Sequence, residues 1–367
     1  MHAPSVGEGL QARPVLERLR RARPDVQLAY TFFSPSAEQL ARSVDADFHD
    51  YLPFDSRSGC RMAIEALRPR ALVFSKLDVW PRLSIEAASR GVRLGLLSAT
   101  LSAASRRRGG LATALLREAY SRLDAVGAIH ADDAERLIEL GVRAEALSIT
   151  GDVRYDQVWQ RAAAVDRSGA LLAPLRSDRF TIVAGSTWPA DEQPVLEGWL
   201  ALRARHPAAR LIVAPHEPTP GHLHPIVEWA RSRGLSLARL DDDQAATADV
   251  VLVDRVGVLG DLYALSDVAF VGGGFHAAGL HSVLEPAAFG APVLFGPRHT
   301  NSRDAALLMV RGGGMSIVSS GELAERLIGW AEDPAARRGA GERARALVRE
   351  GLGAADRSLA LVQSLLA

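Results

Sequence analysis

The sequence predicts an α/β protein made of two doubly wound, Rossmann-like domains, each built on a parallel sheet. Short apolar runs rich in β-branched residues alternate with helical segments, which is typical of parallel sheets covered on both faces. The alternation pauses after residue 152 and restarts near residue 179. The length of 367 residues also suits two domains of ~100 to 200 residues each.

The composition narrows the class of protein further. Hydrophobic residues make up 48% and charged residues 23%, so a packed globular fold is expected and disorder is not. Basic and acidic residues balance at 43 each, which gives no electrostatic reason to expect a nucleic-acid partner. The single Cys60 excludes an internal disulfide and a thiolate metal site. No metal-ligand spacing and no membrane-spanning apolar stretch is present.

The first domain is predicted to occupy residues 1–152. Its strands are expected at residues 26–32, 48–52, 71–75, 125–130 and 146–152, with a further strand starting at residue 92, and its helices at residues 10–23, 36–43, 58–67 and 132–140. Residues 1–3 could form only the end of a first strand, so the start of the domain is expected to be truncated. Residues 153–178 carry no strand pattern and contain Gly169 and Pro174, which predicts an interdomain connection.

The second domain is predicted to occupy residues 179–350, followed by a final helix at 351–367 that packs back on the first domain. Buried strands are expected at residues 268–271 and 292–295, and a helix is expected to open near Ser282. A glycine turn at residues 272–274 separates the first of these strands from that helix. Unpaired amides at helix N-termini beyond strand ends favour anions, so a phosphate is expected there.

Two Ser-x-x-Glu patterns precede predicted helices, at Ser5 to Glu8 and at Ser282 to Glu285. Such a pattern is typical of a capping box, in which both side chains bind backbone amides. The alternative is functional. A carboxylate at the mouth of a cleft could accept the proton that an attacking sugar hydroxyl must lose.

Several of these segments resemble a known family. The segment GLHSVLEPAAFGAPVLFGP resembles the nucleotide-binding segment of the 3-deoxy-D-manno-octulosonic acid (Kdo) transferases of lipopolysaccharide assembly. HAPSVGEG at residues 2–9 resembles the amino-terminal signature of the same family, and the resemblance is colinear over essentially the whole chain. It implies the GT-B glycosyltransferase architecture, in which the two domains face a central cleft.

The resemblance also implies an activity and a set of site residues. The expected reaction is an inverting, metal-independent transfer of Kdo from CMP-Kdo to a lipid A precursor, with no cofactor and with Glu8 as the general base. The acceptor side is expected to include Ser5, Lys76, Asp78, Trp80 and Arg106. The donor side is expected to include Gly185, Ser186, His216, Gly257, Gly274, His281, Ser282, Glu285 and Asn301. The implied location is the cytoplasmic face of the inner membrane, with peripheral contact, because the family's amino-terminal anchor is not found in this sequence.

The chain departs from the family pattern at three positions that affect these expectations. Lys76, the only lysine in the sequence, stands where the family has a glutamate, Thr100 replaces an arginine, and Val258 replaces a glutamate. Two alternatives therefore stay open: another GT-B enzyme that uses a UDP-sugar, either a transferase or an epimerase, and a non-catalytic nucleotide-binding protein of the same fold.

Overall fold

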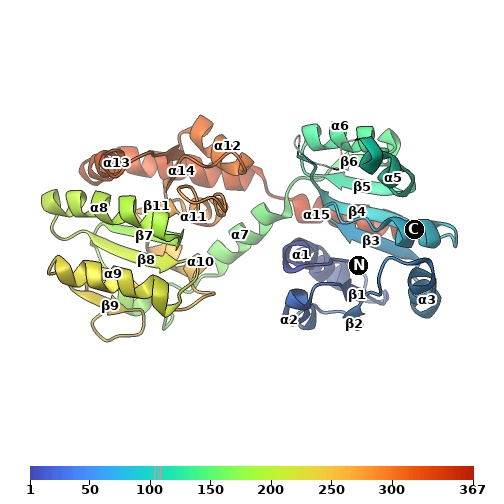
Figure 1. The fold of residues 1–367 in the computed structure, drawn as a ribbon, viewed down its shortest axis with the longest axis horizontal. Helices are drawn as coiled ribbons and strands as arrows, with labels where there is room; N and C mark the ends of the chain where they lie inside the picture. Colours follow the sequence, from blue (N-terminus) through green and yellow to red (C-terminus); the bar gives the residue numbers. More distant parts are fainter. Residues whose placement is uncertain (103–104, 106, 108–109) are drawn as a thin grey trace. The chain divides into compact units, whose positions relative to one another are not determined.

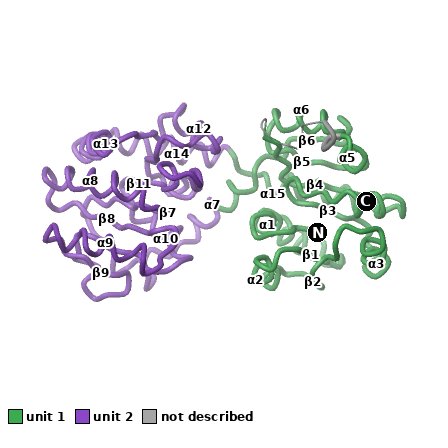
Figure 2. The backbone as a smooth tube through the Cα atoms, viewed as in Figure 1, with its two compact units in different colours: residues 1–157, 351–367 green, residues 158–350 purple. Residues whose placement is uncertain are grey.

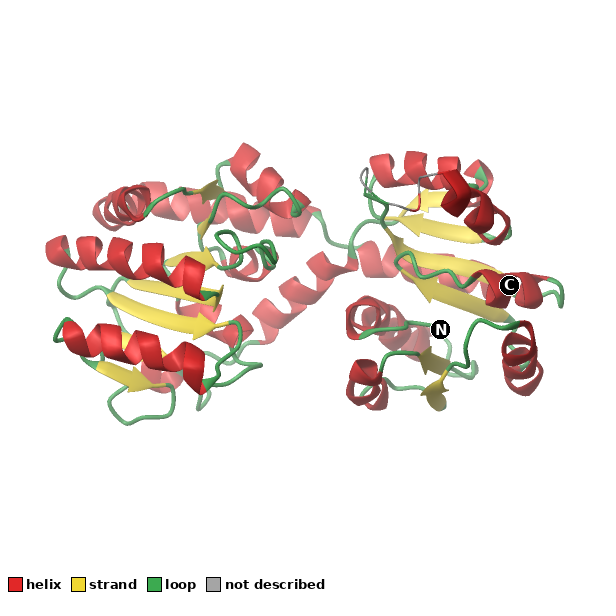
Figure 3. Cartoon of the chain, in the orientation of Figure 1, coloured by secondary structure: helices red, strands yellow, loops and turns green. Residues whose placement is uncertain are grey.

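The structure is a computed structural model that describes every residue except 103–104, 106 and 108–109. The chain forms two compact units (Figure 2). Unit 1 comprises Met1–Gln157 and Gly351–Ala367, and unit 2 comprises Val158–Glu350. Each unit alternates helices with parallel strands (Figure 3), which confirms the predicted class of two doubly wound domains.

The strands of unit 1 form two parallel groups. They are β1 (Ala29–Phe32), β2 (Phe48–Tyr51), β3 (Ala71–Ser75), β4 (Arg93–Ala99), β5 (Ala125–Ala128) and β6 (Leu147–Ile149). Strands β1 and β2 pair with each other, and the other four follow the order β3-β4-β5-β6. His2 forms a parallel bridge to Thr31 of β1 and another to Phe74 of β3. The first residues of the chain therefore join the two groups.

Helices cover both faces of these strands (Figure 1). One face is covered by α1 (Val6–Ala22), α2 (Glu38–Arg42) and α15 (Ala354–Leu366); the other is covered by α3 (Arg57–Leu67), α4 (Pro81–Ala88), α5 (Gly110–Ser121) and α6 (Ala131–Leu140). The Asp156 carboxylate at the start of α7 (Val153–Ala164) accepts hydrogen bonds from the amides of Gly353 and Ala355, both at 2.9 Å. These bonds hold the start of α15 in unit 1.

Unit 2 contains one continuous parallel sheet of seven strands, in the order β13-β12-β11-β7-β8-β10-β9. The strands are β7 (Thr181–Thr187), β8 (Arg210–Pro215), β9 (Leu237–Arg239), β10 (Val250–Leu252), β11 (Val268–Val271), β12 (Val293–Phe295) and β13 (Gly314–Ser316). The helices are α8 (Pro189–Arg205), α9 (Pro220–Ser232), α10 (Leu259–Leu262), α11 (Leu284–Phe289), α12 (Arg303–Arg311), α13 (Ser320–Glu332) and α14 (Pro334–Glu350). The strands are apolar on both faces, as expected of a doubly covered sheet.

Helices α8 and α13 of unit 2 pack together through large buried side chains. Trp199 of α8 is fully buried against the sheet, in the same apolar cluster as Leu323 of α13. Gly198 lets α13 approach, because an added Cβ there would lie 2.8 Å from the Leu323 side chain. None of the helices in the described part of the chain is both long and apolar enough to cross a bilayer.

Candidate active site

The predicted base, Glu8, lies in the first turn of α1 in unit 1 and is only 8% exposed. Its main-chain oxygen accepts a hydrogen bond from the Ser75 hydroxyl, at 3.0 Å, at the end of β3. The carboxylate itself has two partners: one oxygen accepts a hydrogen bond from the Ser5 hydroxyl, and the other lies 3.2 Å from the Lys76 Nζ. The contacts therefore fix both the backbone and the carboxylate of this residue.

The capping-box interpretation of Ser5 is wrong. Ser5 is the N-cap residue of α1, but its side chain makes no bond to a helix amide. It donates instead to the Glu8 carboxylate. The Ser-x-x-Glu pattern therefore forms a hydrogen-bonded pair of side chains, Ser5 and Glu8, in place of a helix cap.

The ionisation of Glu8 follows from three competing effects. Burial raises its pKa, but the hydrogen bond from Ser5 and the positive charge of Lys76 together lower it by more, so the net pKa lies below the usual value. Glu8 is thus held as a carboxylate that can accept a proton.

Lys76 is placed by an uncommon backbone conformation. Its φ is +59°, in the left-handed region that non-glycine residues seldom adopt. Its amide still donates to the carbonyl of Leu97 in β4, at 2.8 Å. Gly7 leaves room for the ammonium, because an added Cβ at that position would lie 3.3 Å from the Lys76 Nζ. The charge that replaces a family glutamate is therefore directed at the candidate base.

The remaining described residues predicted for the acceptor side contact other parts of unit 1 and not Glu8 itself. Trp80 packs edge-on against His2, with ring centroids 4.7 Å apart, so it borders the segment that carries Glu8. Asp78 pairs with Arg107 at 2.9 Å. Arg106 lies outside the described residues. Thr100 donates to the Asp133 carboxylate, at 3.2 Å, which gives it a structural contact.

On the donor side, the glycine turn after β11 is packed backbone to backbone. An added Cβ at Gly272 would lie 2.2 Å from the Ser186 carbonyl oxygen, and one at Gly274 would lie 2.5 Å from the Gly296 amide nitrogen. Gly273 has a φ of +91°. Only glycine fits these positions, because any side chain would push two strand ends apart.

The amides of this turn are less free than predicted. The Asp191 carboxylate, in the first turn of α8, accepts hydrogen bonds from the amides of Gly273 at 2.8 Å and Phe275 at 2.9 Å. It also accepts one from the Trp188 amide at 3.0 Å. A buried protein carboxylate therefore already meets these three donors.

The end of β7, beside this turn, is also closely packed. Ser186 has a φ of +54°, and Gly185 is packed so closely that an added Cβ would lie 2.2 Å from the Tyr263 hydroxyl. Both predicted residues therefore sit at the carboxyl end of a central strand, where ligands of parallel sheets bind.

An imidazole cluster lies near the ends of β7, β8 and β11. The rings of His216 and His281 have centroids 4.3 Å apart, and His276 stacks on Trp188 at 4.4 Å. The Trp188 indole Nε1 donates to the His281 Nε2 at 3.2 Å. Burial, followed by the charge of His216, lowers the pKa of His281. A negative charge bound beside His281 would oppose this effect, because it favours the protonated form of that ring.

Glu285 lies at the start of α11, where burial and charges of both signs affect its carboxyl group. Burial raises its pKa; the charge of Arg161 lowers it and that of Asp261 raises it. The Arg161 guanidinium is bonded to Asp261 at 3.0 Å and to the Gly257 carbonyl at 3.1 Å. Gly257, with a φ of +90°, therefore borders the same charged group as Glu285.

The helix near Ser282 starts later than predicted. Helix α11 begins at Leu284 with Val283 as its N-cap residue, and no side chain caps it. The capping interpretation of Ser282 is therefore wrong, and its side chain is exposed. Asn301 bonds to both main-chain groups of Leu280, at 3.3 and 3.4 Å, so it fixes the loop that carries His281.

Sequence reasoning missed three residues that contact the predicted donor-side residues: Arg161, Trp188 and Asp191. Arg161 lay in the segment read as an interdomain connection. Trp188 and Asp191 lie at the start of α8. In the sequence, Pro189 predicted where this helix begins but not which side chains its first turn would contact. The Asp191 position, two residues after a proline that opens a helix, was the one available signal that its carboxylate faces unpaired amides.

The two units together define a GT-B-like fold. A UDP-N-acetylglucosamine 2-epimerase from Neisseria meningitidis, solved with UDP-GlcNAc, matches 96% of this chain and 98% of its own with a TM-score of 0.68 at 14% identity. The model of the Kdo transferase family matches residues 1–157. A 3-deoxy-D-manno-octulosonic acid transferase from Bordetella pertussis is 30% identical over 98% of this chain and 85% of its own length. One from Haemophilus influenzae is 28% identical over 87% and 75%.

The chain therefore belongs to the 3-deoxy-D-manno-octulosonic acid transferase family, and is an enzyme of the glycosyltransferase class. The resemblance seen in the sequence is confirmed.

Proposed function

We propose that the protein transfers Kdo from CMP-Kdo to a hydroxyl of a lipid A precursor, with inversion at the anomeric carbon and Glu8 as the general base. Family membership supports the sugar and the reaction class. One observation supports the role of Glu8: it is a buried carboxylate whose two oxygens contact a hydroxyl and an ammonium, and whose pKa is lowered in spite of burial.

In the proposed reaction, the acceptor hydroxyl attacks the anomeric carbon of Kdo while its proton passes to Glu8. The bond between that carbon and the CMP phosphate oxygen breaks, and CMP leaves with the electron pair. A single displacement by the acceptor inverts the anomeric centre, because no protein nucleophile intervenes. A positioned base of this kind contributes about 10²- to 10⁴-fold to a rate.

Unit 2 is proposed to hold the donor. Because Asp191 already accepts from the Gly273 and Phe275 amides, we assign the negative charge of the CMP phosphate to the imidazoles of His216 and His281. Glu285 is proposed to bind the ribose hydroxyls beside the Arg161 and Gly257 contact. Gly185 and Ser186 shape the floor of this binding surface at the end of β7.

The lipid acceptor implies work at a membrane surface, and we propose peripheral contact at the cytoplasmic face of the inner membrane. Metal independence is proposed from the family resemblance. A chelator should therefore leave the rate unchanged.

The direct experiment is incubation with CMP-Kdo and a lipid A precursor, scored by CMP release and by the mass gain of the lipid. The proposal predicts both signals, with and without EDTA. UDP-GlcNAc serves as the control donor. Turnover of UDP-GlcNAc in place of CMP-Kdo would transfer the assignment to a UDP-sugar enzyme, and turnover of neither would favour a non-catalytic member.

A further inference from the structure

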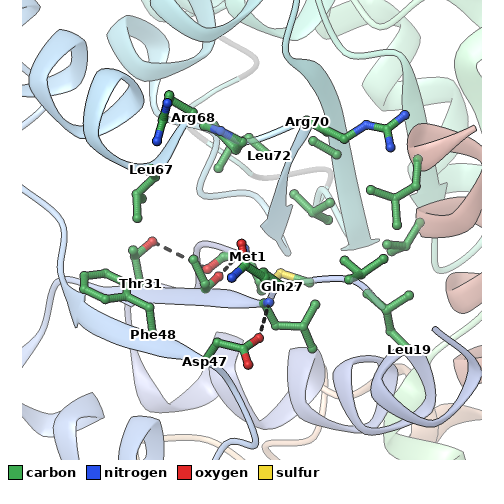
Figure 4. A pocket seen from close by; sticks show the side chains of 18 of the residues that line it. Met1, Leu19, Gln27, Thr31, Asp47, Phe48, Leu67, Arg68, Arg70 and Leu72 are labelled. Atoms are coloured by element: carbon green, nitrogen blue, oxygen red, sulfur yellow. Dashed lines mark hydrogen bonds between the residues drawn. The ribbon is translucent and has the colours of Figure 1, made fainter. Parts of the chain in front are cut away.

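Two cavities of the molecule differ in where they lie on their sheets. The larger one, about 680 Å³, lies in unit 1 around Met1, and its lining includes the first residues of β1, β2 and β3 (Figure 4). The smaller one, about 410 Å³, lies in unit 2, and its lining includes Arg239 at the end of β9 and Asp254 just beyond the end of β10. Parallel sheets bind ligands at the carboxyl ends of their strands. The smaller cavity, which we call the edge pocket, is therefore the better placed for a ligand.

The edge pocket has apolar walls. Pro220, Leu223 and Val227 line it from one face of α9, since they are spaced at three and four residues, and Pro218 lines it from the loop before that helix. Sites for small molecules are typically ~300 to 1,000 Å³ in volume, mostly apolar, with a few polar groups that fix the ligand's orientation. A nucleobase suits such walls, because its ring has two apolar faces and a polar rim.

The polar end of the edge pocket is an ion pair. The Arg239 Nη1 lies 3.3 Å from the Asp254 Oδ2. The Asp254 side chain is 25% exposed, and within the described part of the chain its Oδ1 accepts no hydrogen bond. A carboxylate oxygen can only accept, so Oδ1 is available to an N–H group of a ligand in the pocket.

The edge pocket adjoins the imidazole cluster, to which the phosphate of the donor is assigned. The loop after β8 carries both His216 of the cluster and Pro218 of the pocket. His222, in the first turn of α9, has its ring centroid 6.4 Å from that of Trp188. The helix that walls the pocket therefore also reaches the cluster, and a nucleotide with its phosphate at the cluster can extend its base toward Asp254.

A carboxylate in this position distinguishes the two pyrimidines. Cytosine carries a 4-amino group, which donates hydrogen bonds, whereas the ring oxygen at the same place in uracil accepts them. A carboxylate oxygen accepts from the amino group but repels the uracil oxygen, so one contact both favours cytosine and disfavours uracil. The ion pair with Arg239 holds the carboxylate at the end of the pocket.

We infer that the edge pocket receives the pyrimidine base of the donor nucleotide, and that Asp254 selects cytosine over uracil by accepting a hydrogen bond from its 4-amino group. The inference rests on the proposed CMP-sugar donor and names the residue that would set its selectivity. Asp254 has no part in the chemical step, so nucleotide binding alone tests it.

The test is titration calorimetry of the full chain with CMP, UMP and ribose 5-phosphate, without acceptor. CMP should bind at least about fivefold more tightly than UMP, the low end of what a contact to one base edge provides. Ribose 5-phosphate lacks the ring and should bind at least about tenfold more weakly than CMP, because it buries no surface in the edge pocket.

Two variants locate the effect. In Asp254→Asn the side chain keeps its size but can both donate and accept, so the ratio of CMP to UMP affinity should fall toward one while ribose 5-phosphate binds as before. Val227→Trp fills the edge pocket and should reduce CMP binding to the level of ribose 5-phosphate. Asp243→Asn, an exposed carboxylate between β9 and β10, is the matched control and should keep the wild-type ratio. Circular dichroism establishes that each variant is folded.

The outcomes separate this inference from the proposed function. An unchanged ratio in Asp254→Asn, or normal CMP binding by Val227→Trp, would overturn the inference and leave the CMP-Kdo donor in place. Tighter binding of UMP by the wild type would also overturn it, and would assign the base contact to Arg239 as a donor. The expected CMP selectivity without turnover in the lipid assay would support the base site and contradict the transferase proposal.

Discussion

The two units share a scaffold but differ in how each one holds its candidate site residues. In unit 2 the sheet is continuous, and its site residues project from the ends of central strands and from the turns after them. In unit 1 the sheet is divided, and Glu8 follows directly on the residues that bridge the two parts. The segment that carries the base is therefore held by main-chain bonds near His2 and by the Ser75 hydroxyl, whereas the donor-side candidates lie at strand ends of a continuous sheet.

The two units also differ in the ionisable side chains that they present. Unit 1 presents a carboxylate kept ionised by Ser5 and Lys76. Unit 2 gathers imidazoles with a Glu285 carboxyl whose pKa burial raises. The difference suggests a division of work in which one unit removes a proton and the other binds an anion.

The largest effect should come from Glu8→Gln. We expect kcat to fall about 10²- to 10⁴-fold, because the amide cannot accept the acceptor's proton, while CMP affinity stays unchanged. The measurement is CMP release under saturating donor. Glu17→Gln, on an exposed part of the same helix, is the matched control and should retain full activity. Equal rates for the two variants would remove Glu8 from the base role.

Next in size is a change to the main chain of unit 2. Gly272→Ala places a methyl group against the Ser186 carbonyl and should lower the free energy of unfolding by about 1 to 3 kcal/mol. Gly329→Ala, at a helix position with open space around it, should instead stabilise by about 0.5 to 1 kcal/mol. Urea titration followed by intrinsic fluorescence measures both. An unchanged midpoint for Gly272→Ala would show that the turn is not rigid.

Lys76→Met tests the electrostatics of unit 1 through pH. Loss of the ammonium removes a charge and a hydrogen bond that lower the pKa of Glu8, so this pKa rises and the acid limb of the kcat/KM profile should move to higher pH. At pH values well above that limb, activity should approach the wild-type value. The folded state follows the same sign: the ion pair stabilises it above the unfolded pKa of Glu8 and ceases to do so as pH falls through the folded pKa. A profile that scales down uniformly would indicate loss of structure instead.

The smallest effect is expected for Trp188→Phe. The substitution keeps an aromatic ring against His276 but removes the hydrogen bond to His281, which should cost about 0.5 to 1.5 kcal/mol in CMP binding. Titration calorimetry with CMP measures the change. Trp330→Phe, elsewhere in unit 2, is the control and should leave the affinity unaltered.

Sequence patterns predicted the elements that depend on local signals. The apolar runs at residues 268–271 and 292–295 became β11 and β12, and the proline at 189 opens α8 as expected. Periodicity and turn residues determine such features, because both act over a few neighbouring residues.

Local sequence patterns could not predict which groups the side chains of the site contact. Asp191 bonds to amides more than 80 residues away, and its role follows from the approach of β11 to β7. Ser5 and Ser282 both matched the capping pattern, yet neither caps a helix: Ser5 donates to the Glu8 side chain instead, and α11 begins two residues after Ser282. Arg161 carried no motif at all.

The division of work between the units can be measured most directly by amide hydrogen exchange with and without CMP. The account predicts that CMP slows exchange in unit 2, at residues 185–188, 257–261 and 281–285, and leaves residues 2–8 and 75–80 of unit 1 unchanged. Protection centred on the residues around Glu8, with none near Glu285, would contradict it.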